Sequence, residues 1–570
     1  MTGHDETSAR ARVAGRAVPG VFAAAGLIAV VTLAARVFGF GRWLVFSQSV
    51  GTTCVGSVYQ AANQLPNVVF EVAAGGALAA VVVPIIAGQL ARQNEAEATW
   101  TASAMLTWTL AVLVPLSILM AASARPLSRF LVDNASCAGS TDLMASMLLV
   151  FSPQIALYGV GIVLAGVLQA HRRFLGVVVA PLLSSIVVMV TYLLFADLAH
   201  GTGSDLTRLP SQASGVLAVG TTLGVAALSL SLLVPVHRAG IRLRPAWTFP
   251  EGVARRASAL AGAGLLALVA QQCAVLVTLW VSQHRGGTGT LNVYVYVQAI
   301  YLLPYAVVAV PFAMSALPAL ATGLDQAVLA TGADQAGLPA GADQAALARA
   351  HSTLASSARA IIVTTSAGAA MLFAIATPMG AFFSALDAGR HSHAGQEALA
   401  ALPGALSAFA PGLVGFGMAA LLTRALYVQG RPAVAGGLVA LGWLIAAAVP
   451  LLVLTGDAGP ASTLLWLGLA SSFGMTVAAV GLLVAVRRAW GAKAFRGFTR
   501  SAVVALVAGV FAATLGRGIT AVLHPSGLVG ASVAAVLVAI AVAALFAGSI
   551  WAGDRDSARL ALAKLPGRHR

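Results

Sequence analysis

The sequence predicts an all-α membrane protein that crosses the bilayer about 14 times, as its apolar runs indicate. Of its 570 residues, 59% are hydrophobic and only 9% are charged, against about 25% charged in an ordinary soluble domain. Apolar runs recur along the whole chain, and a bilayer core needs ~20 such residues per helix. The 59 glycines favour close packing between these helices.

The apolar runs form two consecutive series. The first lies near residues 21–48, 58–90, 99–122, 143–169, 174–198, 213–236 and 257–282. The second lies near residues 290–322, 357–384, 402–426, 432–455, 461–486, 501–523 and 527–552. The first run is longer than the ~7–15 residues of a signal-peptide core, which indicates an uncleaved span.

The basic residues predict the orientation of these spans. With the N-terminus in the cytoplasm, 25 of the 33 lysines and arginines fall in cytoplasmic segments and six in outer ones. Cytoplasmic loops of membrane proteins carry this excess, so we expect both termini to be cytoplasmic. The formal net charge of +15 does not indicate a nucleic-acid partner, because the basic residues form no groove-binding face.

The two halves of the chain repeat one pattern. The tripeptide F-S-P at 151–153 opens the fourth predicted span, and F-A-P at 409–411 opens the tenth. The dipeptide L-P occurs at 65–66 in the second span and at 303–304 in the eighth. The repetition predicts two six-helix lobes that are parallel repeats, related by an axis along the membrane normal.

These observations predict five regions. A tandem repeat of nine residues, with the sequences G-L-D-Q-A, G-A-D-Q-A and G-A-D-Q-A, indicates a flexible linker within the second lobe. The regions are a cytoplasmic N-terminal tail (1–20), an N-lobe (21–238), a C-lobe (239–488, with the linker at 323–352), two further helices (489–552) and a basic cytoplasmic tail (553–570).

Charged residues inside the spans mark the candidate binding site. An arginine keeps its charge and costs at least ~3 kcal/mol among lipid tails, so Arg36 and Arg42 must face protein or water. We predict that Arg36 binds a diphosphate bidentately and that Arg42 helps to bind or gate, with structural snorkelling as the alternative for Arg42. Glu71 in the second span could pair with an arginine, take up a proton, or form a structural ion pair.

Other polar residues and helix-bending residues complete the candidate site. Asn63 and Asn67 are expected on one cavity wall and Gln271, Gln272 and Gln298 on the opposite wall, with hydrogen bonding between helices as the alternative. The residues expected to permit bending or gating are Gly39, Pro66, Gly76, Pro153, Pro304 and Pro411.

Cysteines and histidines predict no metal site, cofactor or catalytic centre. The spacing of the three cysteines does not suit metal ligands, and no nucleophile–base pair stands out. Cys54 and Cys137 both fall on the predicted outer side, so a disulfide between them stays open.

Several motifs resemble those of the MurJ/MviN family of lipid II flippases, in the multidrug/oligosaccharidyl-lipid/polysaccharide exporter superfamily. They are R-x-x-G-x-x-R at 36–42, LPN…GA…VP at 65–84, the F-x-P…Q pattern of the fourth span and the LP…LP pattern of the eighth. The similarity covers roughly 20–552. Basic residues that better-known relatives carry after LPN and in the eighth helix are missing, as in an actinobacterial-type branch.

The resemblance implies fourteen helices, a cationic central cavity, and a groove for the undecaprenyl tail formed by the last two helices. It implies a flippase, and no enzyme, that carries lipid II from the inner to the outer leaflet of the bacterial inner membrane by alternating access. Membrane lipids and the cell-wall synthesis machinery would be its further partners. The alternatives are an exporter of another polyprenyl-linked glycan or of a drug, and a non-transporting scaffold for cell division or elongation.

Overall fold

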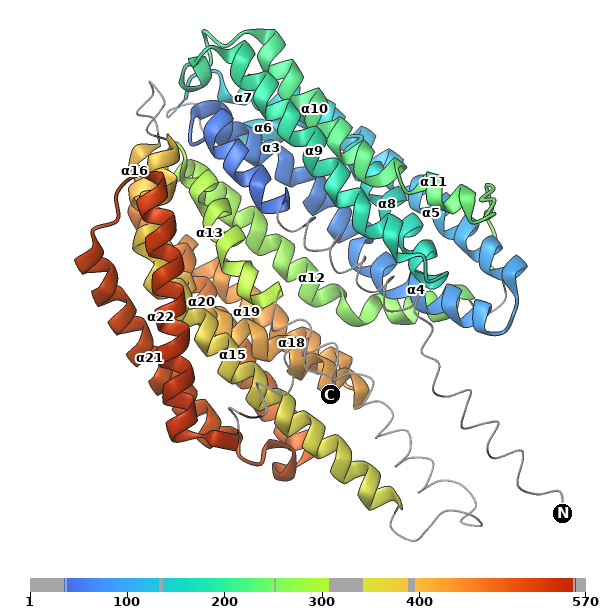
Figure 1. Cartoon of the computed structure of the whole chain (residues 1–570). Helices are drawn as coiled ribbons and strands as arrows, with labels where there is room; N and C mark the ends of the chain where they lie inside the picture. Colours follow the sequence, from blue (N-terminus) through green and yellow to red (C-terminus); the bar gives the residue numbers. More distant parts are fainter. Residues whose placement is uncertain are drawn as a thin grey trace, which may run out of the picture.

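The computed structural model describes residues 38–132, 137–250, 253–306, 342–387 and 395–556, together with residues 35 and 559. The described residues form helices and connecting turns, with no strand among them (Figure 1). Eleven of the described helices are long and apolar enough to cross a membrane. The predicted class, an all-α multi-pass membrane protein, is therefore confirmed. The predicted number of 14 spans stays a prediction, because parts of the first and eighth spans lie outside the described residues.

The first half of the chain folds into one group of packed helices, here called the N-bundle. Its elements are a helix over 38–49, α3 (Cys54–Phe70), η1 (Glu71–Gly75), α4 (Gly76–Ala91), α5 (Glu95–Ala122), α6 (Ala124–Leu131), α7 (Ser140–Phe151), α8 (Gln154–Ala170), α9 (Phe174–Ala199), η2 (Thr202–Ser204), α10 (Ser211–Leu230) and α11 (Leu233–Arg238).

The second half forms a second group, here called the C-bundle, and two final helices. The C-bundle contains α12 (Val253–His284), α13 (Thr290–Pro304), α15 (Ala342–Asp387), α16 (Gln396–Ala400), α17 (Leu402–Phe409), α18 (Gly412–Val428), α19 (Pro432–Val453), α20 (Gly459–Trp490) and η4 (Ala492–Phe495). The final helices, α21 (Phe498–Leu523) and α22 (Gly527–Gly553), pack on α15 and on each other. Helix α12 packs on α19 within the C-bundle and also contacts α4 of the N-bundle.

The predicted bending prolines interrupt the helices at matching places in both bundles. Pro153 separates α7 from α8, and Pro411 separates α17 from α18. Pro66 lies in α3 shortly before the π-helical segment η1, and Pro304 ends α13 where residues 305–306 are again π-helical. A proline removes one helical hydrogen bond and clashes with the preceding turn, so it favours such a break or change of pitch.

The predicted linker over 323–352 is too long at its C-terminal end. Helix α15 begins at Ala342, so residues 342–352 are helical. This stretch is rich in alanine, with leucine, glutamine and arginine, which are strong helix formers. The rest of the tandem repeat lies outside the described residues.

The hydrophobic cores show how the two bundles meet. The outer end, as predicted from the charges, carries the turns at 50–53, 200–210, 285–289 and 454–458. One core at this end joins both bundles and includes Phe46, Tyr59, Tyr296 and Phe383. Toward the other end, the N-bundle and the C-bundle have a separate core each. The described halves therefore share one buried core at the outer end, and α12 also packs against α4 of the N-bundle.

Aromatic rings form the centre of the shared outer core. The Tyr296 ring stacks on Phe383 with 4.8 Å between ring centroids and meets Phe46 of the N-bundle edge-on at 6.2 Å. Phe46 in turn stacks on Tyr59 at 5.8 Å. Such pairs add about 0.5–1.5 kcal/mol each beyond the area they bury.

Candidate functional site

The second predicted span presents a stripe of polar side chains. Asn63, Asn67 and Glu71 are spaced four residues apart along α3 and into η1, which places them on one helix face. Asn67 is exposed, and the other two are half-buried. None of the three has a side-chain hydrogen bond or ion pair to the described part of the chain. The structure thus places the three predicted residues on one face of this helix.

The π-helical turn gives Glu71 an unusual position. Its carboxylate folds back over Gly75, where an added Cβ would overlap the Oε2 atom. The carboxylate is the end of a flexible side chain, so this contact alone does not require a glycine. π-Bulges inside helices occur frequently at functional sites. Gly76, expected to permit bending, begins α4 directly after this turn.

Arg42 lies on the first helix as a half-buried cation. Its Nε atom is buried and has no hydrogen-bond partner among the described residues, and its guanidinium carbon lies 5.2 Å from the Trp43 ring centroid. No ion pair joins it to Glu71 in the described structure. The alternative in which Arg42 pairs with Glu71 is therefore not seen among the described residues. Its predicted role in binding or gating stays a prediction.

The predicted arginine motif lies only partly within the described residues. Arg36 lies outside the described residues, so its predicted contact with a diphosphate stays a prediction. Gly39 is described, and a Cβ at this position would meet no atom within 4 Å. Close packing therefore does not require a glycine here.

The predicted opposite wall stays a prediction. Gln271 is half-buried and Gln272 is buried on α12. Gln298 donates to the hydroxyl oxygen of Tyr294, one turn earlier on α13, at 3.1 Å. This bond lies within one helix, so it is not the hydrogen bond between helices that was the alternative for Gln298.

A polar seal that the sequence did not reveal joins the bundles at their outer end. Gly289, between α12 and α13, donates its N–H to the Ser57 hydroxyl at 2.8 Å, and Gln283 donates to the Ser57 carbonyl at 3.0 Å. Asn292 donates to the carbonyl oxygen of Gly51, a contact for which Gly56 leaves the space. All of these partners are buried. We call Ser57, Gln283, Gly289 and Asn292 the outer seal.

The local sequence explains why α3 begins at this seal. Thr53 accepts a hydrogen bond from the Gly56 N–H at 3.2 Å and donates to the Val50 carbonyl at 2.9 Å. A threonine cap of this kind satisfies one of the free N–H groups of a helix start. Nearby, hydrogen bonds from Thr207 hold the pKa of Asp205 below its usual value. The outer turns are thus fixed by short-range polar contacts.

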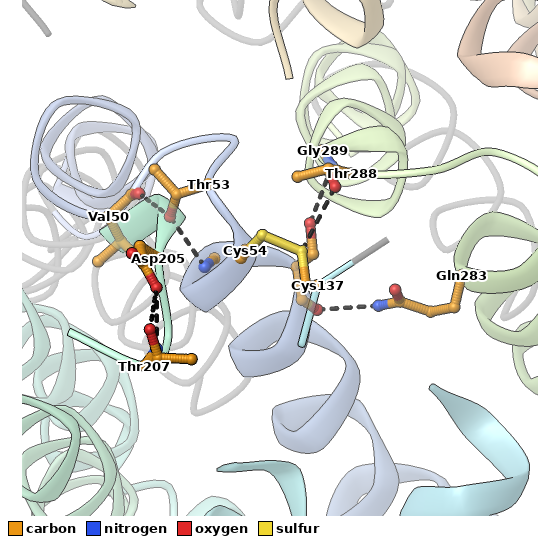
Figure 2. Close-up of a disulfide and its surroundings, with 11 residues drawn as sticks. Val50, Thr53, Cys54, Cys137, Asp205, Thr207, Gln283, Thr288 and Gly289 are labelled. Atoms are coloured by element: carbon orange, nitrogen blue, oxygen red, sulfur yellow. Dashed lines mark hydrogen bonds between the residues drawn. A yellow bond between two sulfur atoms is a disulfide. The ribbon is translucent and has the colours of Figure 1, made fainter. Parts of the chain in front are cut away.

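A disulfide joins Cys54, the first residue of α3, to Cys137 in the turn before α7 (Figure 2). The pairing that the sequence left open is present. The Cys137 sulfur also lies 3.5 Å from the Thr288 hydroxyl, beside Gly289 of the outer seal. The disulfide therefore holds the N-bundle side of the seal in place.

An apolar groove of about 610 Å³ lies between α20 and α21. Helices α15 and α18 form its floor, and α22 contributes no lining residue. The groove implied by the family resemblance involves both final helices, so this groove differs from that expectation.

Arg517, near the outer end of α21, holds this helix against the C-bundle. One of its terminal nitrogens donates to the Phe373 carbonyl at 3.1 Å and to the Ser407 hydroxyl at 2.8 Å, and its guanidinium lies 4.9 Å from the Phe373 ring centroid. It is a half-buried link between helices. No group of three or more potential metal ligands occurs among the described residues.

The described helices together define a multi-pass membrane protein. A solved MATE-family multidrug transporter of the MOP superfamily, in an inward-facing conformation, has the same fold with a TM-score of 0.59. It is 15% identical, and the match covers 81% of this chain and 94% of that one. A solved lipid II flippase MurJ in an inward closed conformation reaches a TM-score of 0.66, again at 15% identity, over 92% of this chain and 99% of that one.

The chain belongs to the lipid II flippase MurJ family, whose model matches residues 46–538. A probable lipid II flippase MurJ of Rhizobium meliloti (strain 1021) is 28% identical over 306 residues, which are 51% of this chain and 53% of the relative. One of Synechocystis sp. (strain ATCC 27184 / PCC 6803 / Kazusa) is 27% identical over 234 residues, 40% of this chain and 42% of the relative. These alignments span about half or less of each curated relative.

Proposed function

We propose that this protein is a flippase that moves lipid II, the undecaprenyl-diphosphate-linked peptidoglycan precursor, from the inner to the outer leaflet. Membership of the MurJ family is the observation that carries this proposal. The chemistry of the site agrees with it, because the cargo carries a diphosphate and the first span carries Arg36 and Arg42. A transporter needs no catalytic residue, and the sequence predicts none.

The division of the hydrophobic cores supports transport by alternating access. The bundles share one core at the predicted outer end and have separate cores toward the inner end. Two rigid halves joined at one end can rock about a site near the bilayer midplane. Opening to the outside would then break the outer seal, while new contacts form at the inner end.

The site residues have distinct proposed roles. Arg36 and Arg42 bind the diphosphate, and the stripe of Asn63, Asn67 and Glu71 lines the path beside it. Gln271 and Gln272 face the cargo from the opposite wall. Arg42 supports this assignment because its buried Nε atom is unpaired among the described residues.

Orientation and partners follow from the same proposal. The excess of basic residues in alternate loops supports cytoplasmic termini and a bacterial inner-membrane location. The matching helix breaks support an N-lobe over 21–238 and a C-lobe over 239–488. The proposal includes contact with the cell-wall synthesis machinery, because that machinery uses the same lipid II that the flippase delivers.

The test is leaflet-specific labelling of lipid-linked precursor in cells depleted of the protein. We expect precursor to accumulate on the inner side, and wild-type protein to restore its exposure outside. Arg36→Ala and Arg42→Ala should not restore it, whereas Arg129→Ala, an exposed residue on α6, should. Normal outer exposure without the protein would refute the flippase function. Full rescue by both arginine variants would refute only their role.

A further inference from the structure

The groove between α20 and α21 has the shape of a lipid-chain site. On α21 its lining runs from Phe498 to Thr514, which is ~24 Å at a rise of ~1.5 Å per residue. One leaflet of the hydrocarbon core is ~15 Å deep, half of the whole core. A complete acyl chain can therefore lie along the groove. Its walls are almost wholly apolar, with lining from Ile362, Val414, Val480, Leu483, Leu506 and Val510.

The end of the groove predicted to be cytoplasmic is cationic. Arg359 lies one helical turn before the floor residue Ile362 on α15, and Arg487 lies one turn after Leu483 on α20. The short helix η4, between α20 and α21, adds Lys493, and Arg496 follows it. Lys493, Arg487 and Arg496 are exposed. Basic residues of α15, α20 and η4 thus lie near one end of an apolar groove.

Arg359 is the cation placed nearest to the groove lining on α15. It is half-buried, its Nε atom is buried without a hydrogen-bond partner, and no carboxylate pairs with it among the described residues. Its Nη1 atom lies 3.5 Å from the position that a Cβ would take at Gly497, directly before the groove residue Phe498. A partly buried cation is costly without an anionic or hydrogen-bonding partner. The guanidinium therefore has donors to offer at the groove mouth.

The two ends of the groove differ in their arginines. At its outer end, Arg517 already donates to Phe373 and Ser407. At the end predicted to be cytoplasmic, the Nε atom of Arg359 has no hydrogen-bond partner among the described residues. The lining of the groove itself contains no charged residue, and neither does that of a second groove of about 570 Å³ between α9 and α10.

We propose that this groove binds an anionic glycerophospholipid of the inner leaflet. Its phosphate contacts Arg359, with Lys493, Arg487 and Arg496 around the headgroup, and one acyl chain fills the space between α20 and α21. Basic pockets between transmembrane helices on the cytoplasmic side are suited to anionic headgroups. The acyl chain would pack against both α20 and α21, which the groove separates. It differs from the transported cargo and lies outside the polar stripe of α3.

The experiment is native mass spectrometry of the purified full chain, titrated separately with phosphatidylglycerol and phosphatidylcholine. We expect phosphatidylglycerol to bind more tightly, and Arg359→Gln to weaken that binding about fivefold while leaving phosphatidylcholine unchanged. Val480→Trp, at an exposed lining position, should block the groove and abolish the bound phosphatidylglycerol. The matched controls are Arg238→Gln, another exposed arginine of the same end, and Val219→Trp in the second groove.

Three results would overturn the proposal. In the first, phosphatidylglycerol and phosphatidylcholine bind equally well. In the second, the Arg359→Gln and Val480→Trp variants bind phosphatidylglycerol as tightly as the wild type does. In the third, undecaprenyl diphosphate displaces the bound phosphatidylglycerol, and no tight site for phosphatidylglycerol is left. The last result would assign the groove to the cargo chain. The leaflet-labelling assay separates this proposal from the flippase function, because that assay does not depend on the phospholipid.

Discussion

Ser57 on α3 receives two hydrogen bonds from the C-bundle, and the shorter of them comes from the backbone N–H of Gly289 at 2.8 Å. The other comes from Gln283, which is 226 residues away in the sequence. Ser57 thus ties together two halves of the molecule at their outer end, through its hydroxyl to Gly289 and through its backbone carbonyl to Gln283. Any motion that opens this end has to break both bonds.

Ser57→Ala should shift the protein toward an outward-open state. It removes the acceptor for the buried Gly289 N–H, and a lost hydrogen bond of this kind costs ~1 kcal/mol, or about fivefold in population. The measurement is the distance distribution between spin labels at residues 207 and 457, in outer turns of the two bundles, in a Cys273→Ser background. Ser146→Ala is the control, because that exposed hydroxyl bonds only within its own helix. An unchanged distribution would show that the seal does not hold the closed state.

Removing the disulfide should lower the thermal stability of the protein. The Cys54–Cys137 bond closes a loop of 83 residues, and such cross-links contribute ~2–4 kcal/mol, chiefly by restricting the unfolded chain. The double variant Cys54→Ser, Cys137→Ser is expected to unfold at a lower temperature in detergent, as is the wild type under reductant. Cys273→Ser, at an exposed free cysteine, should leave the unfolding temperature unchanged. Equal unfolding temperatures for all variants would contradict the structural role.

Glu71→Gln should strengthen binding of the lipid-linked diphosphate. The carboxylate lies on the same stripe as Asn67 and makes no ion pair with Arg42 in the described structure, so it acts as a like charge toward an anionic cargo. Removing a half-exposed charge of this kind should raise the affinity about two- to fivefold. Native mass spectrometry with undecaprenyl diphosphate measures the change. Glu95→Gln, at the exposed start of α5, is the control.

A different result for Glu71 would be equally informative. If Glu71→Gln keeps the affinity of wild type but stops translocation, the carboxylate acts in proton transfer and does not repel the cargo. The two readouts, binding and leaflet-specific labelling, therefore decide between the predicted roles of this residue.

Gly474→Ala should destabilise the C-bundle. Helices α19 and α20 touch through their backbones here, since a Cβ at Gly442 would lie 2.7 Å from the Gly474 carbonyl oxygen and one at Gly474 would overlap the Gly442 carbonyl. Overpacking of this kind costs ~1–3 kcal/mol. Gly437→Ala on α19 is the control, because no atom lies within 4 Å of its added Cβ and alanine favours a helix. Thermal unfolding in detergent measures both variants, and equal losses would contradict the prediction.

Hydropathy and proline positions were sufficient for the architecture because both act locally. A run of ~20 apolar residues has few alternatives to a membrane helix. A proline removes a hydrogen bond from its own helix, so the breaks at Pro153 and Pro411 could be predicted, although α5 and α9 continue through Pro115 and Pro181. The C-terminal boundary of the linker was misplaced because the last repeat unit also contains helix formers. Helix α15 therefore begins within that unit, at Ala342.

The arginines and the polar stripe were predictable for a related reason. A charge inside an apolar run needs a polar surrounding, so Arg42 and Glu71 stood out before any fold was known. Their pairing was not predictable. A span places a residue at a depth in the membrane but leaves its direction around the helix axis open, and the two groups form no pair in the described structure.

Contacts between segments that are distant in the sequence could not be predicted and were seen only in the tertiary structure. Ser57, Gln283 and Asn292 are ordinary polar residues near span ends, where the sequence looks the same whether they face water or another helix. The disulfide and the unpaired Arg359 likewise depend on which helices become neighbours. Local composition dictates helices and their depth, because it fixes the free energy of each segment in lipid. Which polar groups meet follows only from the packing of many segments at once, because each pair gains too little by itself to select its partner.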